Sequence, residues 1–107
     1  MVTTNPMVAV FEIEGKKFMC LNGGPEFKPT DANSYVVSCE NQDEIDYYWN
    51  KLTSDGGQES MCGWLKDKFG FSWQIIPHNI GTLLSKPGAI QAMLKMRKLD
   101  INGLMNP

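Results

Sequence analysis

The sequence predicts one α+β domain in which a β-hairpin precedes a strand, a helix and three further strands. Three observations favour this class. Segments 34–39 and 71–76 are rich in β-branched and aromatic residues and are bounded by turn residues, as strands commonly are. Between them, segment 45–52 repeats apolar residues at the spacing of one helix face. The 107 residues also suit one domain, because domains usually contain about 100–150 residues.

The hairpin is predicted at the start of the chain. Segment 7–13 is rich in Val and Phe, and segment 17–21 contains a continuous apolar run. Glu14 and Gly15 connect the two, and a short connection that contains Gly is a hairpin signal. The Asn-Gly-Gly-Pro sequence of 22–25 then ends the second strand and begins a loop that reaches Asn33.

The helix that follows the strand at 34–39 has recognisable ends. Asn41 and Glu44 have the spacing of a capping box, in which the first side chain caps the helix and the second reaches back. The run 54–57 contains two glycines and stops the helix. The predicted apolar face consists of Ile45, Tyr48, Trp49 and Leu52. Trp49 and, on a later strand, Trp73 are therefore expected to be structural, each contributing about 3–5 kcal/mol.

Three strands are predicted after this helix. Segment 58–60 is a short candidate, 61–66 is a stronger one, and 71–76 runs back from a turn at 67–70. Pro77 ends the last strand.

Residues 78–107 are predicted to be helical, with Pro87 in a first turn and Asp100 capping a last turn. Four residues of this segment are predicted to share one helix face, namely Ile90, Met93, Leu94 and Arg97. The basic cluster nearby is interpreted as favourable charge at a helix end, and it consists of Lys95, Arg97 and Lys98.

Segments 17–21 and 72–76 resemble each other, since both close a hairpin with an aromatic residue at the second position. This echo suggests a duplicated βαβββ unit whose first copy lacks its leading strand and helix. The single domain 1–107 is thus divided into a remnant hairpin at 1–24, a second module at 34–77 and a helical segment at 78–107.

Composition excludes several classes. Hydrophobic residues make up 42% of the chain and the net charge is -2, so the chain is globular and lacks the basic stripe of a nucleic-acid binder. No apolar run approaches the ~18 residues of a membrane span, and the first six residues resemble no secretory signal, so a cytoplasmic location without membrane contact is expected. Cys20, Cys39 and Cys62 are interpreted as free buried thiols rather than a disulfide framework.

Common catalytic motifs are missing from the sequence. The sequence contains no Gly-x-Ser-x-Gly motif, so the only histidine, His78, has no serine nucleophile for which it could act as a base. A metal site needs ~3–4 converging ligands, so a single histidine does not indicate one. We interpret it as an ordinary surface histidine. Neither a G-x-G-x-x-G nor a G-x-x-x-x-G-K sequence occurs, so no nucleotide cofactor is expected. The carboxylates Asp43, Glu44 and Asp46 are interpreted as favourable, solvated charge at a helix start.

The strand at 71–76 offers the best candidate site. Alternation places Ser72 and Gln74 on one face and Trp73 and Ile75 on the other, which covering helices would bury. A polar pair among apolar walls is typical of a small-molecule pocket, and equally of polar residues satisfied within a core. Both interpretations stay open.

Three segments, 18–28, 34–40 and 62–75, together resemble the PhnB-like branch of the vicinal oxygen chelate superfamily. That superfamily includes glyoxalase I, extradiol dioxygenases and the bleomycin and fosfomycin resistance proteins. The branch also bears the label 3-demethylubiquinone-9 3-methyltransferase. The resemblance implies two paired βαβββ modules of the glyoxalase-like fold, which form a cup around a site. Here the first module lacks its leading strand and helix, through truncation or because a partner completes the sheet, and a homodimer through sheet elements is expected.

The resemblance also assigns positions to the site. Metal-dependent members carry His or Glu ligands on inward strand faces, and the matching positions here are Met19, Ser34 and Gln74. These are poor ligands for a divalent metal, so no metal and no cofactor are expected. The expected ligand pocket consists of Met19, Tyr35, Trp64, Ser72 and Gln74.

Several functions remain open on this basis. The first is a metal-free dimer that binds a small apolar or aromatic molecule. The alternatives are a metal-dependent enzyme of the glyoxalase–dioxygenase class, the methyltransferase of the family label, and a degenerate structural dimer whose inner face is packed shut.

Overall fold

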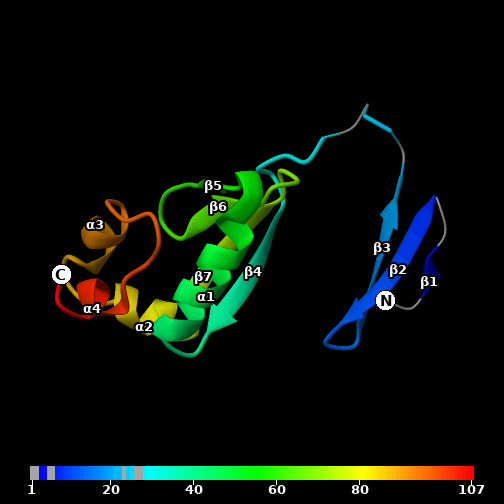
Figure 1. Cartoon of the computed structure of the whole chain (residues 1–107). Coiled ribbons are helices and arrows are strands. Elements are labelled where there is room, and N and C mark those ends of the chain that lie inside the picture. The colour runs from blue at the N-terminus through cyan, green and yellow to red at the C-terminus, as the bar shows by residue number, and fades with distance from the viewer. Residues whose placement is uncertain (1–2, 5–6, 23, 26–27) are drawn as a thin grey trace.

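The computed structural model describes residues 3–4, 7–22, 24–25 and 28–107. Its strands form two sheets, one with the order β1-β2-β3 and one with the order β4-β7-β6-β5 (Figure 1). Among the described residues, the helices all follow β4. The predicted α+β class is confirmed, and the order strand, helix, strand, strand, strand is found from β4 to β7.

The N-terminal sheet contains the predicted hairpin. β2 (Val8–Ile13) and β3 (Lys16–Leu21) pair antiparallel, and Glu14 and Gly15 between them have φ angles of 49° and 81°. Two consecutive positive φ angles are the geometry of the tight turn whose twist matches a hairpin. A third strand, β1 (Thr3–Thr4), pairs with β2 and was not predicted, because two residues are too short to show an alternating pattern.

The second sheet is mixed. β4 (Ser34–Cys39) runs parallel to β7 (Ser72–Pro77), and β6 (Trp64–Lys66) and β5 (Gln58–Glu59) continue antiparallel. The predicted strand at 61–66 is shorter because Cys62 and Gly63, at φ angles of 60° and 85°, form a turn before it.

Helix α1 (Gln42–Thr53) begins as predicted. The Asn41 Oδ1 atom accepts a hydrogen bond from the backbone N–H of Glu44 at 2.9 Å, and the Glu44 carboxylate accepts from the N–H of Glu40 at 3.1 Å. Beyond Thr53 the chain continues into a 3₁₀ turn, η1 (Ser54–Gly56), where Asp55 and Gly56 have φ angles of 55° and 106°. The predicted run 54–57 therefore stops the helix, beginning at Ser54, whose φ and ψ angles of -68° and 161° are extended.

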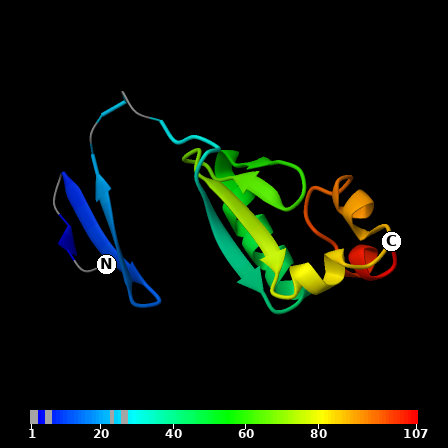
Figure 2. The ribbon, with the colours of Figure 1, turned by 180° about the vertical axis from the view of Figure 1, so that it is seen from behind.

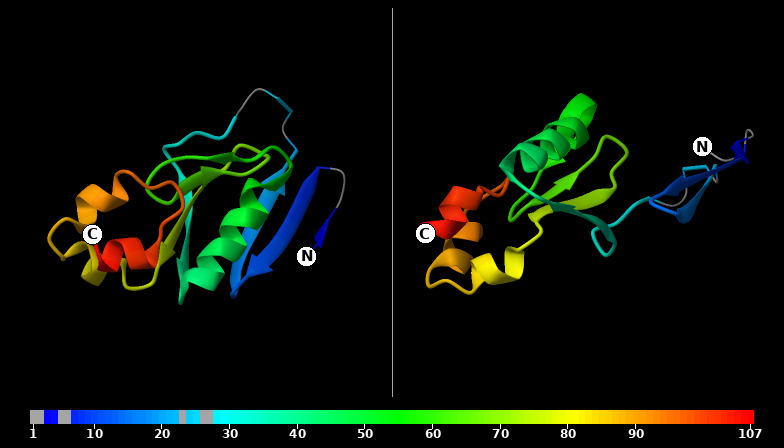
Figure 3. Two further views of the ribbon diagram at one scale, coloured as in Figure 1. Left: turned by 60° about the vertical axis from the view of Figure 1, so that its left-hand side comes forward. Right: turned by 90° about the horizontal axis from the view of Figure 1, so that it is seen from below.

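Helix α1 covers one face of the second sheet. In Figure 2 the strands β4 and β7 lie in front of α1, and Figure 3 shows the helix above the sheet. The core between them consists of Cys39, Ile45, Trp49, Leu65 and Ile75, with Val37, Leu52 and Trp73 packed against it. Tyr48, predicted on the apolar face, is instead 37% exposed, where its ring meets that of Tyr47.

The C-terminal segment is helical as predicted, but in short pieces: α2 (Ile80–Leu84), α3 (Ala89–Met93) and α4 (Ile101–Met105). On the face predicted for Ile90, Met93, Leu94 and Arg97, Ile90 and Leu94 are 49% and 58% exposed. The buried residues are Leu83, Ala89, Leu99 and Leu104. Ile90, Met93 and Leu94 lie on α3 or at its end, whereas Arg97 lies beyond the helix and does not continue that face. The predicted cap is confirmed, because the Asp100 Oδ1 atom accepts from the N–H of Gly103.

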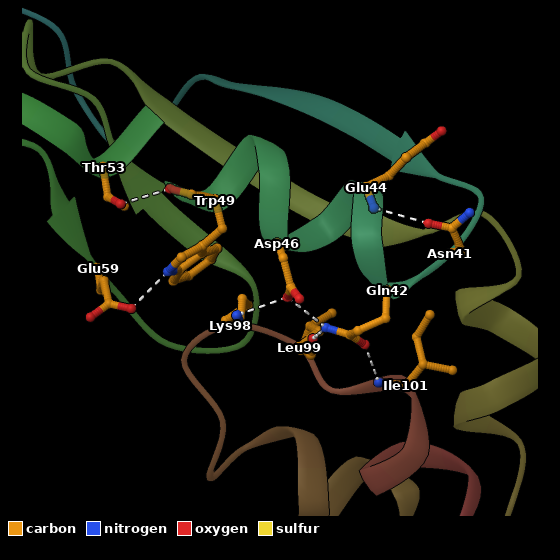
Figure 4. A network of polar contacts seen from close by, with 10 residues as sticks. All are labelled: Asn41, Gln42, Glu44, Asp46, Trp49, Thr53, Glu59, Lys98, Leu99 and Ile101. Atoms are coloured by element: carbon orange, nitrogen blue, oxygen red, sulfur yellow. Dashed lines mark hydrogen bonds and ion pairs between the residues drawn. The ribbon is translucent and has the colours of Figure 1, made fainter. Parts of the chain in front are cut away.

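A polar network ties this segment to α1 (Figure 4). The Gln42 side chain donates to the carbonyl of Leu99 at 3.0 Å and accepts from the N–H of Ile101 at 2.8 Å. Lys98 forms an ion pair of 2.8 Å with Asp46, which also accepts from Gln42. The hydrogen bond from Lys98 holds the pKa of Asp46 below its usual value. The basic cluster is thus not only helix-end charge, because Lys98 reaches across to another helix.

The molecule is elongated. Its radius of gyration is 16.1 Å, whereas a compact chain of this length has about 13 Å. The N-terminal sheet stands beside the β4 edge (Figures 1 and 3), where the rings of Phe18 and Tyr35 meet with centroids 6.4 Å apart. Across the described ranges, no helix has the length and apolarity to cross a membrane.

The three cysteines are free, as predicted, but they are not all buried. Cys20 is exposed on β3, where no layer covers the short sheet within the described residues, and Cys62 is half-buried. Only Cys39 lies in the core, and burial raises the pKa of its thiol to about 11.

Candidate functional site

The candidate site lies on the face of the second sheet opposite α1. Residues that pair directly across strands share a face, so this face follows from the register. Trp64 pairs with Gln74, Lys66 with Ser72, and Ser72 with Ser34 on its other side. We call this the open face, and its residues are Ser34, Val36, Trp64, Lys66, Ser72 and Gln74. The residues between them, including Trp73 and Ile75, point toward α1 and pack in or against the core.

A cavity of about 370 Å³ lies at one end of the open face. It is lined by Asp31, Ser60, Met61, Cys62, Trp64, Leu65, Lys66 and Ser72, and we call it the Trp64 pocket. Trp64 is half-buried and Met61 is 42% exposed, so an indole and a thioether offer apolar surface to a ligand. The pocket therefore combines apolar walls with a few polar groups, as binding sites for small molecules commonly do.

The polar groups of the Trp64 pocket converge on one atom. Lys66 Nζ lies 3.0 Å from Asp31 Oδ1, and the Ser72 hydroxyl donates to the same oxygen at 3.2 Å. Ser72 is 3% exposed, so this carboxylate gives a buried hydroxyl its partner. The hydrogen bond and charge of Lys66, with help from Ser72, hold the pKa of Asp31 below its usual value.

A second hollow of about 330 Å³ adjoins the first at Ser72. It is lined by Pro29, Thr30, Asn33, Ser34, Tyr35, Phe71 and Ser72. Tyr35 contributes from the sheet edge, because it pairs in register with Trp73 and its ring centroid lies 5.0 Å from that of Trp73. Tyr35 therefore belongs to the α1 side of the sheet and not to the open face.

The five residues expected to form the pocket are thus only partly brought together. Trp64 and Ser72 line the Trp64 pocket, whereas Tyr35 meets Ser72 only in the second hollow. Gln74 lines neither of these two cavities, and its side-chain amide donates to the Ser34 hydroxyl at 2.9 Å. Met19 lies on β3 in the other sheet and is 69% exposed.

Sequence reasoning missed Asp31, Lys66 and Met61. Lys66 could have been found, because it stands two positions after Trp64 on the same strand and so shares its face. Asp31 carries no such signal, since it lies in a loop 41 residues before Ser72 along the chain.

The wall of the Trp64 pocket at Met61 and Cys62 is held by the C-terminal segment. The backbone N–H groups of Cys62 and Gly63 donate to the carbonyls of Met96 and Arg97 at 2.7 and 2.8 Å. Gly63 has a φ angle of 85°, and a Cβ atom there would lie 3.1 Å from the carbonyl oxygen of Ile75. Glycine is therefore required at this turn by both its backbone angle and the close approach of β7.

The positions that the resemblance matched to metal ligands do not form a ligand set. Met19 lies on β3 in the other sheet, whereas Ser34 and Gln74 bind each other through a hydroxyl and a neutral amide. Within the described part of the chain, no three His, Cys, Asp or Glu side chains converge as a metal site would need. His78 follows directly after the end of β7. Its ring lies beside the carbonyl of Cys39 and 3.8 Å from the Glu40 carboxylate.

The chain was compared with known proteins. A family model described as 3-demethylubiquinone-9 3-methyltransferase matches residues 2–76, which include the hairpin, α1 and both strands that line the Trp64 pocket. A search of the curated proteins found no match.

Proposed function

This chain belongs to the 3-demethylubiquinone-9 3-methyltransferase family, a family of the vicinal oxygen chelate type, and from that membership we propose that it is a homodimer that binds a small apolar or aromatic molecule without a metal ion. The ligand occupies the Trp64 pocket on the open face. The observation that carries this proposal is the contrast between the two faces of one sheet. One is covered by α1, and the other is hollowed beside Trp64 and Ser72.

The size and lining of the Trp64 pocket support a small ligand. Its volume of about 370 Å³ falls in the lower part of the range of about 300–1,000 Å³ that small-molecule sites occupy. Trp64 and Met61 supply apolar contact, while Lys66 and Ser72 supply donors that can orient a polar group. Apolar burial provides the affinity of such a site, and its few polar groups provide the orientation.

The family description names methyl transfer, for which S-adenosylmethionine supplies the methyl group when it is bound. The residues present do not fit a nucleotide-type cofactor at a helix start. In the described ranges, β4 passes into α1 through Glu40 and Asn41, and β7 passes into α2 through His78 and Asn79, so neither connection contains a glycine. The Asn41 side chain already caps α1. Glycine is what lets a bound nucleoside approach the backbone closely at such a connection, so we propose no methyl transfer.

The binding proposal is tested by the indole N–H signals of the protein in a two-dimensional ¹H–¹⁵N spectrum. Titration with indole or 2-phenylethanol is expected to shift the signal of Trp64 and to leave that of Trp49 unchanged, since Trp49 is 2% exposed and its N–H is bonded to Glu59. A Trp64→Leu variant should lose the ligand-induced shifts of the backbone amides of Met61 and Lys66, whereas Phe69→Leu, at a side chain 69% exposed outside the pocket, should keep them. An unchanged Trp64 signal with every probe would contradict the proposal.

Metal analysis of the same purified protein separates this function from the enzymatic alternative. We expect less than stoichiometric Zn, Ni, Mn and Fe, because the thioether, hydroxyl and amide at the matched positions are weak ligands for these ions. One tightly held ion per chain would overturn the metal-free assignment and favour an enzyme of the glyoxalase–dioxygenase class.

The dimer proposal is supported by the sheet edges and by apolar exposure. In the described part of the chain, β3 has a strand partner only on its β2 side, and β4 only on its β7 side. Unpaired edges of this kind are usually covered or paired. The side chains of Met19 and Leu21 on β3 are 69% and 65% exposed, and Val36 on β4 is 56% exposed. A second copy that packs on these strands would cover both the edges and the apolar surface.

Light scattering at micromolar concentration is expected to give twice the chain mass of 12.0 kDa. Leu21→Glu should shift the protein toward monomers, because a charge would have to be buried at the interface. Met105→Glu is the matched control, since this side chain on α4 is also exposed, at 45%, but lies outside the two sheets. A folded monomer of the unchanged protein would rule the dimer out.

A further inference from the structure

The Trp64 pocket already holds a carboxylate, supplied by the chain itself. Asp31 Oδ1 accepts from Lys66 Nζ at 3.0 Å and from the Ser72 hydroxyl at 3.2 Å. The two donors stand side by side because Lys66 and Ser72 are directly paired between β6 and β7. The carboxylate oxygen therefore accepts charge-assisted hydrogen bonds from an ammonium and a hydroxyl, and such bonds are stronger than those between neutral groups.

The two sides of this contact differ in how firmly they are held. Lys66 and Ser72 belong to strands, and Ser72 is almost fully buried. Asp31 belongs to the loop before β4, and its side chain is 70% exposed. The donors are therefore part of the rigid sheet, while the acceptor comes from a loop that pairs with no strand among the described residues. An exposed ion pair of this kind is weak enough for another carboxylate to displace.

The apolar walls lie next to the same donors. Trp64 precedes Lys66 by two positions on β6, so both side chains are on the open face, and Met61 lines the cavity beside them. A molecule that placed a carboxylate on Lys66 and Ser72 would therefore have its adjoining carbon skeleton against an indole and a thioether.

Resting on the proposed binding function, we propose that the Trp64 pocket selects aromatic carboxylates, whose carboxylate takes the place of Asp31 on Lys66 and Ser72 while the ring packs against Trp64 and Met61. Asp31 then acts as an internal competitor that occupies the donors until such a ligand arrives. Removal of the Asp31 carboxylate is therefore expected to raise the affinity for the ligand. A merely structural role for Asp31 would predict no such gain.

The test compares phenylacetate with phenylacetamide, a neutral molecule of nearly the same shape, by titration of the Trp64 indole signal. Phenylacetate should bind about tenfold more tightly to the unchanged protein, as expected for a hydrogen bond to a charged group. Asp31→Asn should tighten phenylacetate binding about two- to fivefold, the strength of an exposed ion pair, and should leave phenylacetamide unchanged. Lys66→Met should remove the preference for phenylacetate.

Lys68→Met serves as the matched control, since its ammonium lies over the ring of Phe69 and outside the Trp64 pocket. It should leave both affinities unchanged. The gain expected from Asp31→Asn cannot arise from a variant that fails to fold. Weaker binding of phenylacetate to Asp31→Asn would overturn the inference, and so would tighter binding of 2-phenylethylamine than of phenylacetate.

The outcomes also separate the inference from the function on which it rests. Equal affinity for phenylacetate and phenylacetamide, with Trp64 perturbed by both, would overturn carboxylate selection and leave the binding function standing. If none of the aromatic probes perturbed Trp64, both would fall.

Discussion

Trp49→Ala is expected to lower the free energy of unfolding by about 3–5 kcal/mol, the range for a large aromatic residue truncated in a core. Trp49 is 2% exposed and packs among Ile45, Leu65 and Ile75. Its indole N–H also donates to the Glu59 carboxylate at 2.7 Å, which ties α1 to β5 (Figure 4). Truncation removes both the apolar contact and this bond, and the surrounding helix and strands can collapse only partly into the space.

Urea denaturation at one fixed protein concentration measures this loss. Trp49→Phe should cost less, because most of the apolar contact is kept while the bond to Glu59 is lost. Tyr47→Ala on the same helix is the control, since Tyr47 is 57% exposed and its truncation should change stability by about 0.5 kcal/mol or less. A loss below about 1 kcal/mol for Trp49→Ala would show that α1 does not pack as described. Trp73→Ala is expected to lower the free energy of unfolding by about 3 kcal/mol, the lower end of this range, because Trp73 is only half-buried.

Gln42→Ala is expected to cost about 2–4 kcal/mol and to loosen the C-terminal segment. The amide of Gln42 bonds the carbonyl of Leu99 and the N–H of Ile101, and Leu99 is fully buried (Figure 4). Without the amide these two backbone groups lose their partner, and each buried unsatisfied group costs about 1–3 kcal/mol. The Asp46–Lys98 ion pair remains, but both side chains are more than one-third exposed, so it compensates little.

Hydrogen exchange distinguishes this local effect from general destabilisation. In Gln42→Ala, amide protection should fall at residues 96–105 before it falls in β7, because the lost bonds hold only the C-terminal segment to α1. Gln42→Glu should be no better, since it places a carboxylate against the carbonyl of Leu99 and the carboxylate of Asp46. Gln91→Ala on α3, at an exposed side chain, is the control and should leave exchange unchanged. Unaltered protection at 96–105 in Gln42→Ala would contradict the anchoring role.

Local signals explain why much of the fold could be predicted. The β4 strand was predicted with the bounds that the structure has, and the cap formed by Asn41 and Glu44 was predicted to the residue. The strand is visible as a run of β-branched and aromatic residues, although its partner β7 lies far along the chain. The cap depends on residues three positions apart, so the sequence pattern contains the whole interaction. The hairpin turn at Glu14 and Gly15 is local in the same way.

The C-terminal segment shows where this reasoning ends. Its composition predicted helix, but the sequence could not show that the chain turns at Gly88 with a φ angle of 85° and that Leu99 and Leu104 are buried in place of Ile90 and Leu94. Leu99 is held against α1 through Gln42, which lies 57 residues earlier in the chain, so no local pattern contains this contact. Tertiary packing of this kind overrides the periodicity of short helices.

In the candidate site, too, some features follow from local sequence and others from contacts between distant residues. The sequence by itself determined that Ser72 and Gln74 stand on the face opposite Trp73 and Ile75, because alternation along a strand is a property of the backbone. Only the tertiary structure decided that Asp31 closes on Lys66 and Ser72, that Gln74 is satisfied by Ser34, and that Tyr35 lies with Trp73. These contacts join residues roughly 40 positions apart. The entropic cost of closing so long a loop is met by the packing of the whole fold, so no local sequence pattern indicates which residues will meet.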